Sequence, residues 1–342
     1  MQRLCSFRIT FEWIAMLAIL TIGTAVIPLT ARAQDPYQFE TDLVAKRRVF
    51  RDVGAGFRAI RRGPQGNYFI LTAPDPVVRI YDSTGKPVGQ IPNETAVKAK
   101  GAALVYGESF DVDSDGRVVV CDRGANAIKI YSPDGALLNV ILFPAPVSVT
   151  WLLNGEVAVT GPDASHLVMV YGVDGNLLRD YGDREEIGDR ADLNNQVNYG
   201  ELTSDEVGNT YFAFDYLPEP TVRMFDHAGY MSLEISLMTL EFEPAAQAAR
   251  RAIARSETGV PALHRIINAM GVDPKTQDVW LAIGTQLMHF DKEGKRLATF
   301  RTYMPSNARL EAATILVEPD RILIGADPHG IYEFRKPVQP PQ

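Results

Sequence analysis

Cysteine is almost absent from this sequence, which has only Cys5 and Cys121 among its 342 residues. Cys5 lies in an N-terminal segment with the pattern of a cleaved signal, so Cys121 is left without a partner and no internal disulfide is expected. Cys121 ends the apolar run 118–120, where a free cysteine usually behaves as a small buried hydrophobe. Stability must therefore come from packing.

Long apolar runs are also scarce, and the prominent one stands at the N-terminus. Arg3 and Arg8 precede an apolar run over residues 13–29, and a small-residue cleavage site ends at Ala33. Thr21, Gly23, Thr24 and Pro28 weaken this run as a spanning helix, which needs about 20 apolar residues. We expect a cleaved secretory signal over 1–33, an extracytoplasmic protein (periplasmic or secreted), and no stable membrane span after cleavage. A retained anchor is the alternative.

An excess of positive charge is missing as well. The net charge is −8, and it becomes −10 once the signal, with its three basic residues and one acidic residue, is removed. Repulsion from phosphates makes nucleic acid an unfavourable partner, and an anionic membrane surface is disfavoured for the same reason. We predict no nucleic-acid partner.

Motifs that carry known chemistry are absent too. The histidines are scattered singly, and no His-Glu-x-x-His zinc spacing, Gly-x-Ser-x-Gly elbow or phosphate-binding glycine loop occurs. We therefore predict no catalytic residues, no metal ligands and no cofactor. An active site assembled from distant segments stays open as the alternative.

What the sequence does contain is a repeat. Its clearest copy, over 110–135, is typical of a strand, a turn, a second strand, a loop, a third strand and a glycine turn. Five more copies show the same order. In all six an aromatic residue closes the third strand, and these residues are Tyr81, Tyr131, Tyr171, Phe225, Phe290 and Phe334.

The repeat predicts an all-β fold, a six-bladed β-propeller, because a lone four-stranded sheet cannot bury both of its faces. The proline-rich tail after Phe334 cannot supply a last strand, so residues 46–53 are expected to close the ring from the N-terminus. Residues 244–256 predict a helical insertion between blades four and five. The expected divisions are a signal over 1–33, an N-terminal extension over 34–46, one propeller domain over 47–337 and a C-terminal tail over 338–342.

Blade two resembles the NHL-repeat family of six-bladed propellers. The resemblance is carried by residues 110–122, Asn126 and residues 128–135, and the match extends over about 47–337. The Trp-Asp signature of WD40 blades is absent. The resemblance implies a repeat protein with no single activity, since the family includes binding scaffolds, lactonase-like hydrolases, strictosidine-synthase-like enzymes and amidating lyases.

The strand order places all long insertions (93–107, 183–199, 240–265 and 302–307) on one face, and functional residues often lie on loops held by a rigid scaffold. Shorter loops project polar residues onto the same face. The predicted ligand-binding residues are Asp122, Arg123, Asn126, His166, Asp215, Tyr216, Asp327 and His329.

One turn comes near to a calcium-binding pattern. Asp111, Asp113 and Asp115 precede Gly116, and Asp122 stands where such a loop has its bidentate glutamate. Residues 117–121 predict a strand, whereas a calcium loop of this kind is followed by a helix. We therefore predict an ordinary turn, with calcium binding as the open alternative.

These observations favour an exported, non-enzymatic binding module that recognises a protein partner or a polar small ligand on its insertion-bearing face. The alternative is a metal-dependent, lactonase-like hydrolase or lyase with its site at the mouth of the central channel. A subunit of an envelope complex is a third hypothesis.

Overall fold

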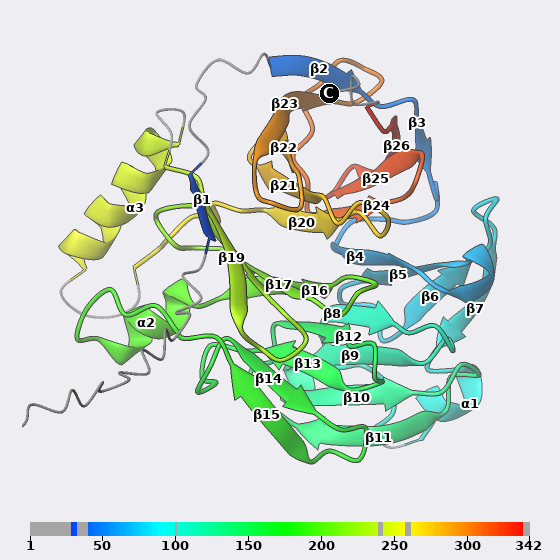
Figure 1. Cartoon of the computed structure of the whole chain (residues 1–342). Helices are drawn as coiled ribbons and strands as arrows, with labels where there is room; N and C mark the ends of the chain where they lie inside the picture. The colour runs from blue at the N-terminus through cyan, green and yellow to red at the C-terminus, as the bar shows by residue number, and fades with distance from the viewer. Residues whose placement is uncertain (1–28, 33–39, 100, 239–241, 257–260, 338–342) are drawn as a thin grey trace, which may run out of the picture.

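The computed structural model describes residues 29–32, 40–99, 101–238, 242–256 and 261–337. It confirms the six-bladed, all-β propeller: the strands form six sheets, and the first strand of each sheet contacts the first strands of both neighbouring sheets. Figure 1 shows the chain passing from sheet to sheet in sequence order and returning to its start.

The six blades are numbered in chain order, each from its innermost strand outward. Blade 1 is β4 (Phe57–Arg62), β5 (Tyr68–Thr72), β6 (Val78–Tyr81) and β7 (Pro87–Ile91); blade 2 is β8 (Gly107–Val112), β9 (Val118–Asp122), β10 (Ala127–Tyr131) and β11 (Leu137–Leu142); blade 3 is β12 (Ser148–Trp151), β13 (Val157–Thr160), β14 (Val168–Tyr171) and β15 (Leu177–Tyr181). Blade 4 is β16 (Gly200–Ser204), β17 (Thr210–Phe214), β18 (Thr221–Phe225) and β19 (Met231–Ser236); blade 5 is β20 (Ala269–Val272), β21 (Val279–Ile283), β22 (Gln286–Phe290) and β23 (Arg296–Tyr303); blade 6 is β24 (Thr314–Val317), β25 (Arg321–Ala326), β26 (Gly330–Arg335) and β3 (Arg47–Val49).

The ring closes through β3, as predicted. Val49 pairs with Ile331 in an antiparallel ladder, so the N-terminal strand is the outermost strand of the last blade. This strand is shorter than the expected 46–53, because Phe50 has a positive φ of 47° and leaves the ladder. The Phe50 ring packs instead against Tyr68 and Tyr81, with centroids 5.2 and 5.4 Å away.

Two further N-terminal strands extend outer edges. β1 (Leu29–Arg32) runs parallel to β19, and β2 (Glu40–Val44) runs parallel to β23. β1 belongs to the predicted signal, and cleavage after Ala33 would remove it. The rest of the predicted signal, residues 1–28 and 33, lies outside the described residues. The predicted C-terminal tail, residues 338–342, lies outside them as well. In the part of the chain that the structure describes, no helix has the length and apolarity needed to cross a membrane.

The helices lie in links from an outer strand to the next inner strand, or in short loops. The links carry α1 (Glu94–Val97), α2 (Ala191–Val197) and α3 (Glu243–Arg255), and the loops carry the 3₁₀ turns η1 (Pro64–Gly66) and η2 (Arg123–Ala125). α3 confirms the predicted helical insertion between blades 4 and 5. Its own residues Ala246 and Ala249 are buried.

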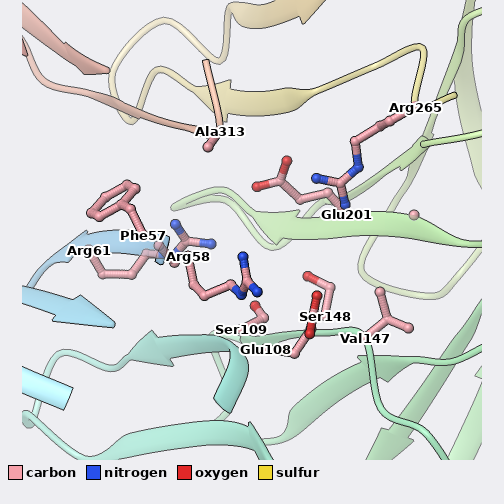
Figure 2. Close-up of a pocket in the computed structure, with 12 residues that line it drawn as sticks. Phe57, Arg58, Arg61, Glu108, Ser109, Val147, Ser148, Glu201, Arg265 and Ala313 are labelled. Atoms are coloured by element: carbon pink, nitrogen blue, oxygen red, sulfur yellow. The ribbon is translucent and has the colours of Figure 1, made fainter. Parts of the chain in front are cut away.

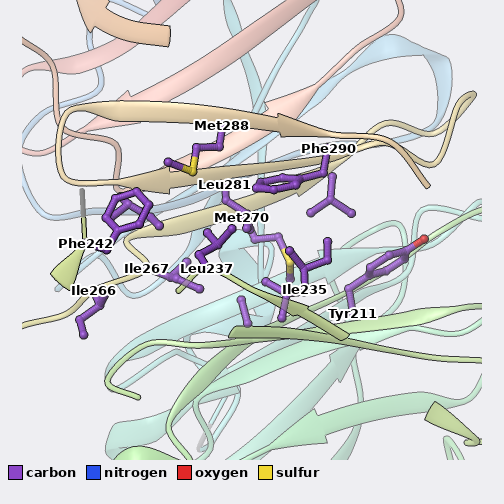
Figure 3. Close-up of a cluster of buried hydrophobic side chains, with 14 of the residues drawn as sticks. Tyr211, Ile235, Leu237, Phe242, Ile266, Ile267, Met270, Leu281, Met288 and Phe290 are labelled. Atoms are coloured by element: carbon purple, nitrogen blue, oxygen red, sulfur yellow. The ribbon is translucent and has the colours of Figure 1, made fainter. Parts of the chain in front are cut away.

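Apolar side chains fill the seams between neighbouring blades. Each of the six clusters of buried side chains among the described residues joins two adjacent blades. Figure 3 shows the cluster between blades 4 and 5, where Phe242 at the start of α3 joins Ile235, Met270 and Phe290. Cys121 is fully buried in the seam of blades 2 and 3, as expected of a small hydrophobe. The seams supply the packing that a chain without disulfides requires.

The repeated aromatic residues and glycine turns have the expected local structure. Five of the six aromatics that close the third strands are at most 2% exposed, and Tyr171 is half-buried. The glycines that follow (Gly85, Gly135, Gly175, Gly229 and Gly294) have φ between 80° and 90°. Only glycine adopts this conformation without steric cost, which explains its recurrence in these turns.

Candidate functional site at the channel mouth

The innermost strands begin around a small polar cavity on the insertion-bearing face. The cavity measures about 100 Å³, and it is lined by blades 1 to 4 and by the links before blades 5 and 6. Figure 2 shows the side chains converging from the first residues of the inner strands and from the links just before them. The lining residues are Phe57, Arg58, Ala59, Arg61, Glu108, Ser109, Val147, Ser148, Gly200, Glu201, Arg265 and Ala313.

Local irregularities in two inner strands direct charged side chains into this cavity. The ladder between β4 and β5 shifts register between Phe57 and Ala59, and the ladder between β8 and β9 shifts between Gly107 and Ser109. Arg58 and Glu108 are the extra residues at these two bulges. A bulge re-aims a side chain that would otherwise point into a packed face, so both residues are presented to the channel.

Three arginines and two glutamates therefore share a narrow space. Arg265 forms an ion pair with Asp215, whose side chain is buried at the entrance. Arg61 lies 3.7 Å from Asp111, deeper in the channel. Arg58 donates a hydrogen bond to the Tyr106 hydroxyl and lies with its guanidinium 5.4 Å from that ring's centroid.

Glu201 is held mainly by the backbone. Its Oε2 accepts a hydrogen bond from the backbone N–H of Met270 at 2.8 Å. Burial raises the pKa of Glu201 to about 7, although Arg61 acts to lower it. Burial likewise raises the pKa of Asp215 to about 6, against the opposing effect of Arg265. Glu201 thus carries a proton for part of the time at neutral pH.

Two hydrogen-bond donors at the mouth have no partner. Among the described residues, Arg58 Nε and the Tyr199 hydroxyl are buried and make no hydrogen bond. Tyr199 immediately precedes β16, and Arg123 lies over its ring at 5.4 Å. A buried donor without a partner costs free energy, about 1–3 kcal/mol, which binding of an acceptor would recover.

Three of the predicted ligand-binding residues lie at this mouth. Asp215 holds Arg265 there, and its backbone carbonyl accepts a hydrogen bond from Ile266 N–H at 2.7 Å. Tyr216 packs edge-on against Tyr199, with ring centroids 6.0 Å apart. Arg123 is exposed, and its guanidinium lies over the Tyr199 ring.

Three others hold the surrounding loops. Asp122 is fully buried, accepts hydrogen bonds from the backbone of Val105 and Tyr106, and pairs with Lys129 at 2.7 Å. The Asn126 side chain accepts a hydrogen bond from Ala145 N–H, and Asn126 itself has the left-handed conformation.

Asp327 has a similar place in blade 6. Its carboxylate accepts a hydrogen bond from Gly56 N–H at 2.8 Å, directly before the strand that carries Arg58. The carboxylates of Asp122 and Asp327 therefore fix the backbone leading to Tyr106 and Arg58, and they position the site from its loops.

The two predicted histidines lie apart from the cavity. His166 pairs with Asp180 of the outermost strand β15, at 2.9 Å. His329 is exposed at the tip of the loop between β25 and β26. Neither residue lines the channel mouth.

The charges of the cavity were not predicted. Arg58, Glu108 and Glu201 each stand second in an innermost strand, β4, β8 or β16, where a propeller repeat leads one to expect a largely buried side chain. That mismatch between charge and an expected buried strand is the signal that would have found them. Arg265, in the link before β20, has no comparable sequence signal.

The calcium-like turn uses its carboxylates internally. Asp113 accepts hydrogen bonds from the backbone of Asp115 and Arg117 and pairs with the Arg117 side chain at 2.6 Å. Asp111 accepts hydrogen bonds from Thr150 and Trp151 of the next blade, both at 2.8 Å. Over the described ranges, no group of three or more His, Cys, Asp or Glu side chains has the arrangement of a metal site.

An apolar groove adjoins the mouth on the same face. It has a volume of about 630 Å³ and lies between α3 and blade 5. Ala245, Ala248 and Ala252 of α3 form one wall, and Ile283 lies in the other. Arg265 lines both the groove and the polar cavity.

Comparison with known proteins gives the fold and no family. No family model matches the chain, and no curated protein matches it. A streptogramin B lyase structure matches with a TM-score of 0.52 and 14% identity, over 83% of this chain and 84% of that one. A catalytically inactive virginiamycin B lyase variant from Staphylococcus aureus, solved with quinupristin, matches with a TM-score of 0.52 and 14% identity, over 83% of this chain and 96% of that one.

A propeller of another kind is equally similar. The RRP9 WD40 repeats match with a TM-score of 0.55 and 12% identity, over 86% of this chain and 99% of that one. At such low identity the likeness shows the propeller fold alone. Function has to be argued from the site.

Proposed function

We propose that this protein is a binding propeller whose channel mouth holds a small organic anion through a carboxylate or a similar acidic group. The single observation that carries the proposal is Arg58, whose Nε is buried in the mouth without a hydrogen-bond partner among the described residues. A guanidinium presents its donors in a planar fork that matches a carboxylate, and such charge-assisted bonds are among the stronger ones.

The rest of the mouth supports an anion. Arg61 and Arg265 line the same cavity, and Glu201 opposes them with a full charge only above about pH 7. Below that pH the negative charge of Glu201 falls, so the three arginines of the lining are opposed less strongly. Within the described part of the chain, the Tyr199 hydroxyl adds a second buried donor that lacks a partner.

The test is calorimetric titration of the full chain with a set of carboxylates, beginning with acetate, succinate and benzoate. Arg58→Gln is expected to weaken binding by about 10- to 100-fold, the effect of losing a charge-assisted hydrogen bond. Arg251→Gln is the matched control, because Arg251 is an exposed arginine of α3 that lines neither cavity nor groove. Equal affinities of Arg58→Gln and the parent protein for every carboxylate would disprove the proposal.

The placement of this activity is part of the proposal. We infer an exported protein, periplasmic or secreted, with its signal cleaved after Ala33 and an NHL-type propeller spanning about 47–337. The pattern of residues 3–33 and the repeat in blade 2 support this inference. N-terminal sequencing of the protein recovered from its host tests it, and an intact residue 1 would contradict it.

A second candidate function is an acid–base reaction at the same mouth, of the hydrolase or lyase type. Glu201 favours it, because a carboxylate with a pKa near 7 exchanges protons readily at neutral pH. Incubating the protein with its tightest ligand and analysing the mixture by mass spectrometry, with and without EDTA, distinguishes the two functions. Turnover that Glu201→Gln abolishes would establish the enzyme, and EDTA sensitivity would establish its metal dependence.

A further inference from the structure

The polar cavity and the apolar groove differ in size and chemistry. The cavity holds about 100 Å³, enough for a carboxyl-sized group but well below the volume of about 300–1,000 Å³ that encloses an ordinary small ligand. The groove has about 630 Å³, which lies within that range. A ligand anchored by its charge at the cavity therefore has room for its remaining atoms only in the groove or in solvent.

Arg265 joins the two spaces. It lines both, and its ion pair with the buried Asp215 carboxylate fixes its guanidinium at their junction. Ile266 is held beside it through the Asp215 backbone, so the floor of the groove and the edge of the cavity belong to one segment. The described residues thus offer a charged end and an apolar end that share Arg265 in their linings.

The wall formed by α3 is suited to an apolar ligand. Ala245 and Ala248 are exposed and Ala252 is half-buried, and their small side chains leave the space that longer ones would fill. Ile283 and Phe242, both nearly buried, line the groove as well. Covering these apolar groups removes them from water, which favours binding in proportion to the area covered.

From these observations we propose that the ligand is an amphipathic monocarboxylate, with its carboxylate beside Arg58 and Arg61 and its hydrocarbon portion in the groove under α3. The inference rests on the proposed anion site. It adds the chemical class of the ligand: a chain or ring of apolar carbons attached to one acidic group. Charge complementarity favours this occupant over a neutral lipid, and the narrow cavity favours a single small head group over a larger acidic one.

The experiment compares three ligands of graded chemistry by calorimetry on the full chain. They are octanoate, below the concentration at which it forms micelles, acetate and octanol. Octanoate is expected to bind at least about tenfold more tightly than acetate and than octanol, because it alone satisfies both ends.

Two matched substitutions on one helix locate the apolar end. Ala248→Phe places a ring in the groove and is expected to weaken octanoate binding by about tenfold or more while leaving acetate unchanged. Ala254→Phe makes the same change at an exposed alanine of α3 that does not line the groove, and it is expected to change neither affinity. Circular dichroism and thermal melting confirm that both variants are folded.

The outcomes separate this inference from the proposal on which it rests. If acetate binds as tightly as octanoate, with both affinities lost in Arg58→Gln and neither changed in Ala248→Phe, the anion site stands and the amphipathic ligand is wrong. If no carboxylate binds and Arg58→Gln has no effect, the anion site itself is wrong. A dimer in sedimentation that Ala248→Phe dissociates would assign the groove to a second copy of the chain and overturn the inference.

Discussion

The two ends of the central channel have similar residues, but their buried carboxylates differ in the hydrogen bonds that they accept from side chains. At the turn end, Glu318 follows β24, is 2% exposed, and accepts hydrogen bonds from Arg62 at 2.8 Å, the Tyr68 hydroxyl at 2.8 Å and Arg321 at 2.5 Å. At the insertion-bearing end, Glu201 also stands among arginines, yet the hydrogen bond that it accepts comes from a backbone N–H.

Other carboxylates at the turn end follow the pattern of Glu318. Asp205 accepts hydrogen bonds from Val207 N–H, Asn209 N–H and the Tyr211 hydroxyl, at 3.0, 2.9 and 2.9 Å. Asp273 accepts them from Lys275 N–H and Thr276 N–H and pairs with Lys336. Hydrogen bonds of this kind stabilise the inner turns and occupy the carboxylates of that end.

The comparison shows how function can be separated from structure in a uniform ring. Both ends contain buried acids, arginines and tyrosines, so composition does not distinguish them. The difference lies in the charged donors: among the described residues, Arg58 Nε is buried at the mouth without a hydrogen-bond partner, whereas Trp151 Nε1, a buried donor without a partner in the turn-end pocket, is uncharged. The mouth is therefore the end that we assign to an anionic ligand.

The largest effect is expected at the saturated end. Glu318→Ala leaves Arg62, Arg321 and Tyr68 without their shared acceptor, so the free energy of unfolding should fall by about 3–5 kcal/mol. Chemical denaturation of the variant beside the parent measures this. A loss below about 1 kcal/mol would mean that the turn end does not depend on Glu318 and would break the comparison.

At the mouth, replacing a carboxylate is expected to raise the free energy of unfolding at high pH instead of lowering it. The pKa of Glu201 is raised from 4.5 to about 7 in the folded protein, so between these values the folded state binds more protons than the unfolded chain. The stability linked to this group is therefore present below about pH 4.5 and is lost as the pH rises to about 7.

Glu201→Gln removes that loss, because an amide does not ionise and still accepts a hydrogen bond. At pH 8 the variant should be more stable than the parent by about 1–3 kcal/mol, and at pH 4 the two should agree. Asp215, whose pKa is raised to about 6, remains in both proteins and contributes equally. Denaturation at the two pH values measures the difference, and a Glu201→Gln variant that is less stable at pH 8 would contradict the account.

A smaller effect concerns binding. Ionised Glu201 opposes a bound anion, while Arg61 and Arg265 lower the pKa of Glu201 by their positive charge. The dissociation constant of octanoate should therefore rise by about tenfold between pH 6 and pH 8, one proton being lost on the way. Asp215, with a pKa of about 6, is half ionised at pH 6 and loses most of its remaining proton by pH 7, so Glu201→Gln should make the affinity nearly independent of pH from 7 to 8.

The fold was largely predictable, because the pattern that encodes it is repeated. Six aromatics at the ends of the third strands and the proline-rich tail after Phe334 predict both the blades and their N-terminal closure, and β3 pairs with β26 as expected. β1 and β2 were not predicted, since a short strand added in parallel to an outer edge leaves no periodic pattern.

The site was only partly predictable. The position of loop residues such as Asp215 and Tyr216 beside the mouth was predictable, because turns between predicted strands are easy to locate; their ligand-binding role stays a prediction. Arg58 and Glu108 reach the channel through bulges, and a bulge depends on a register shift between strands that a single sequence does not display. Asp122 is the opposite case: it is a polar loop residue whose carboxylate accepts hydrogen bonds from the backbone N–H groups of Val105 and Tyr106.

The most direct test of the central claim is a crystal structure of the protein soaked with 4-iodobenzoate, whose iodine can be located by anomalous scattering. The account predicts a carboxylate within hydrogen-bond distance of Arg58 Nε and iodine in the groove beside Ala248. Iodine and carboxylate bound elsewhere, with Arg58 Nε satisfied by a group of the protein, would contradict it.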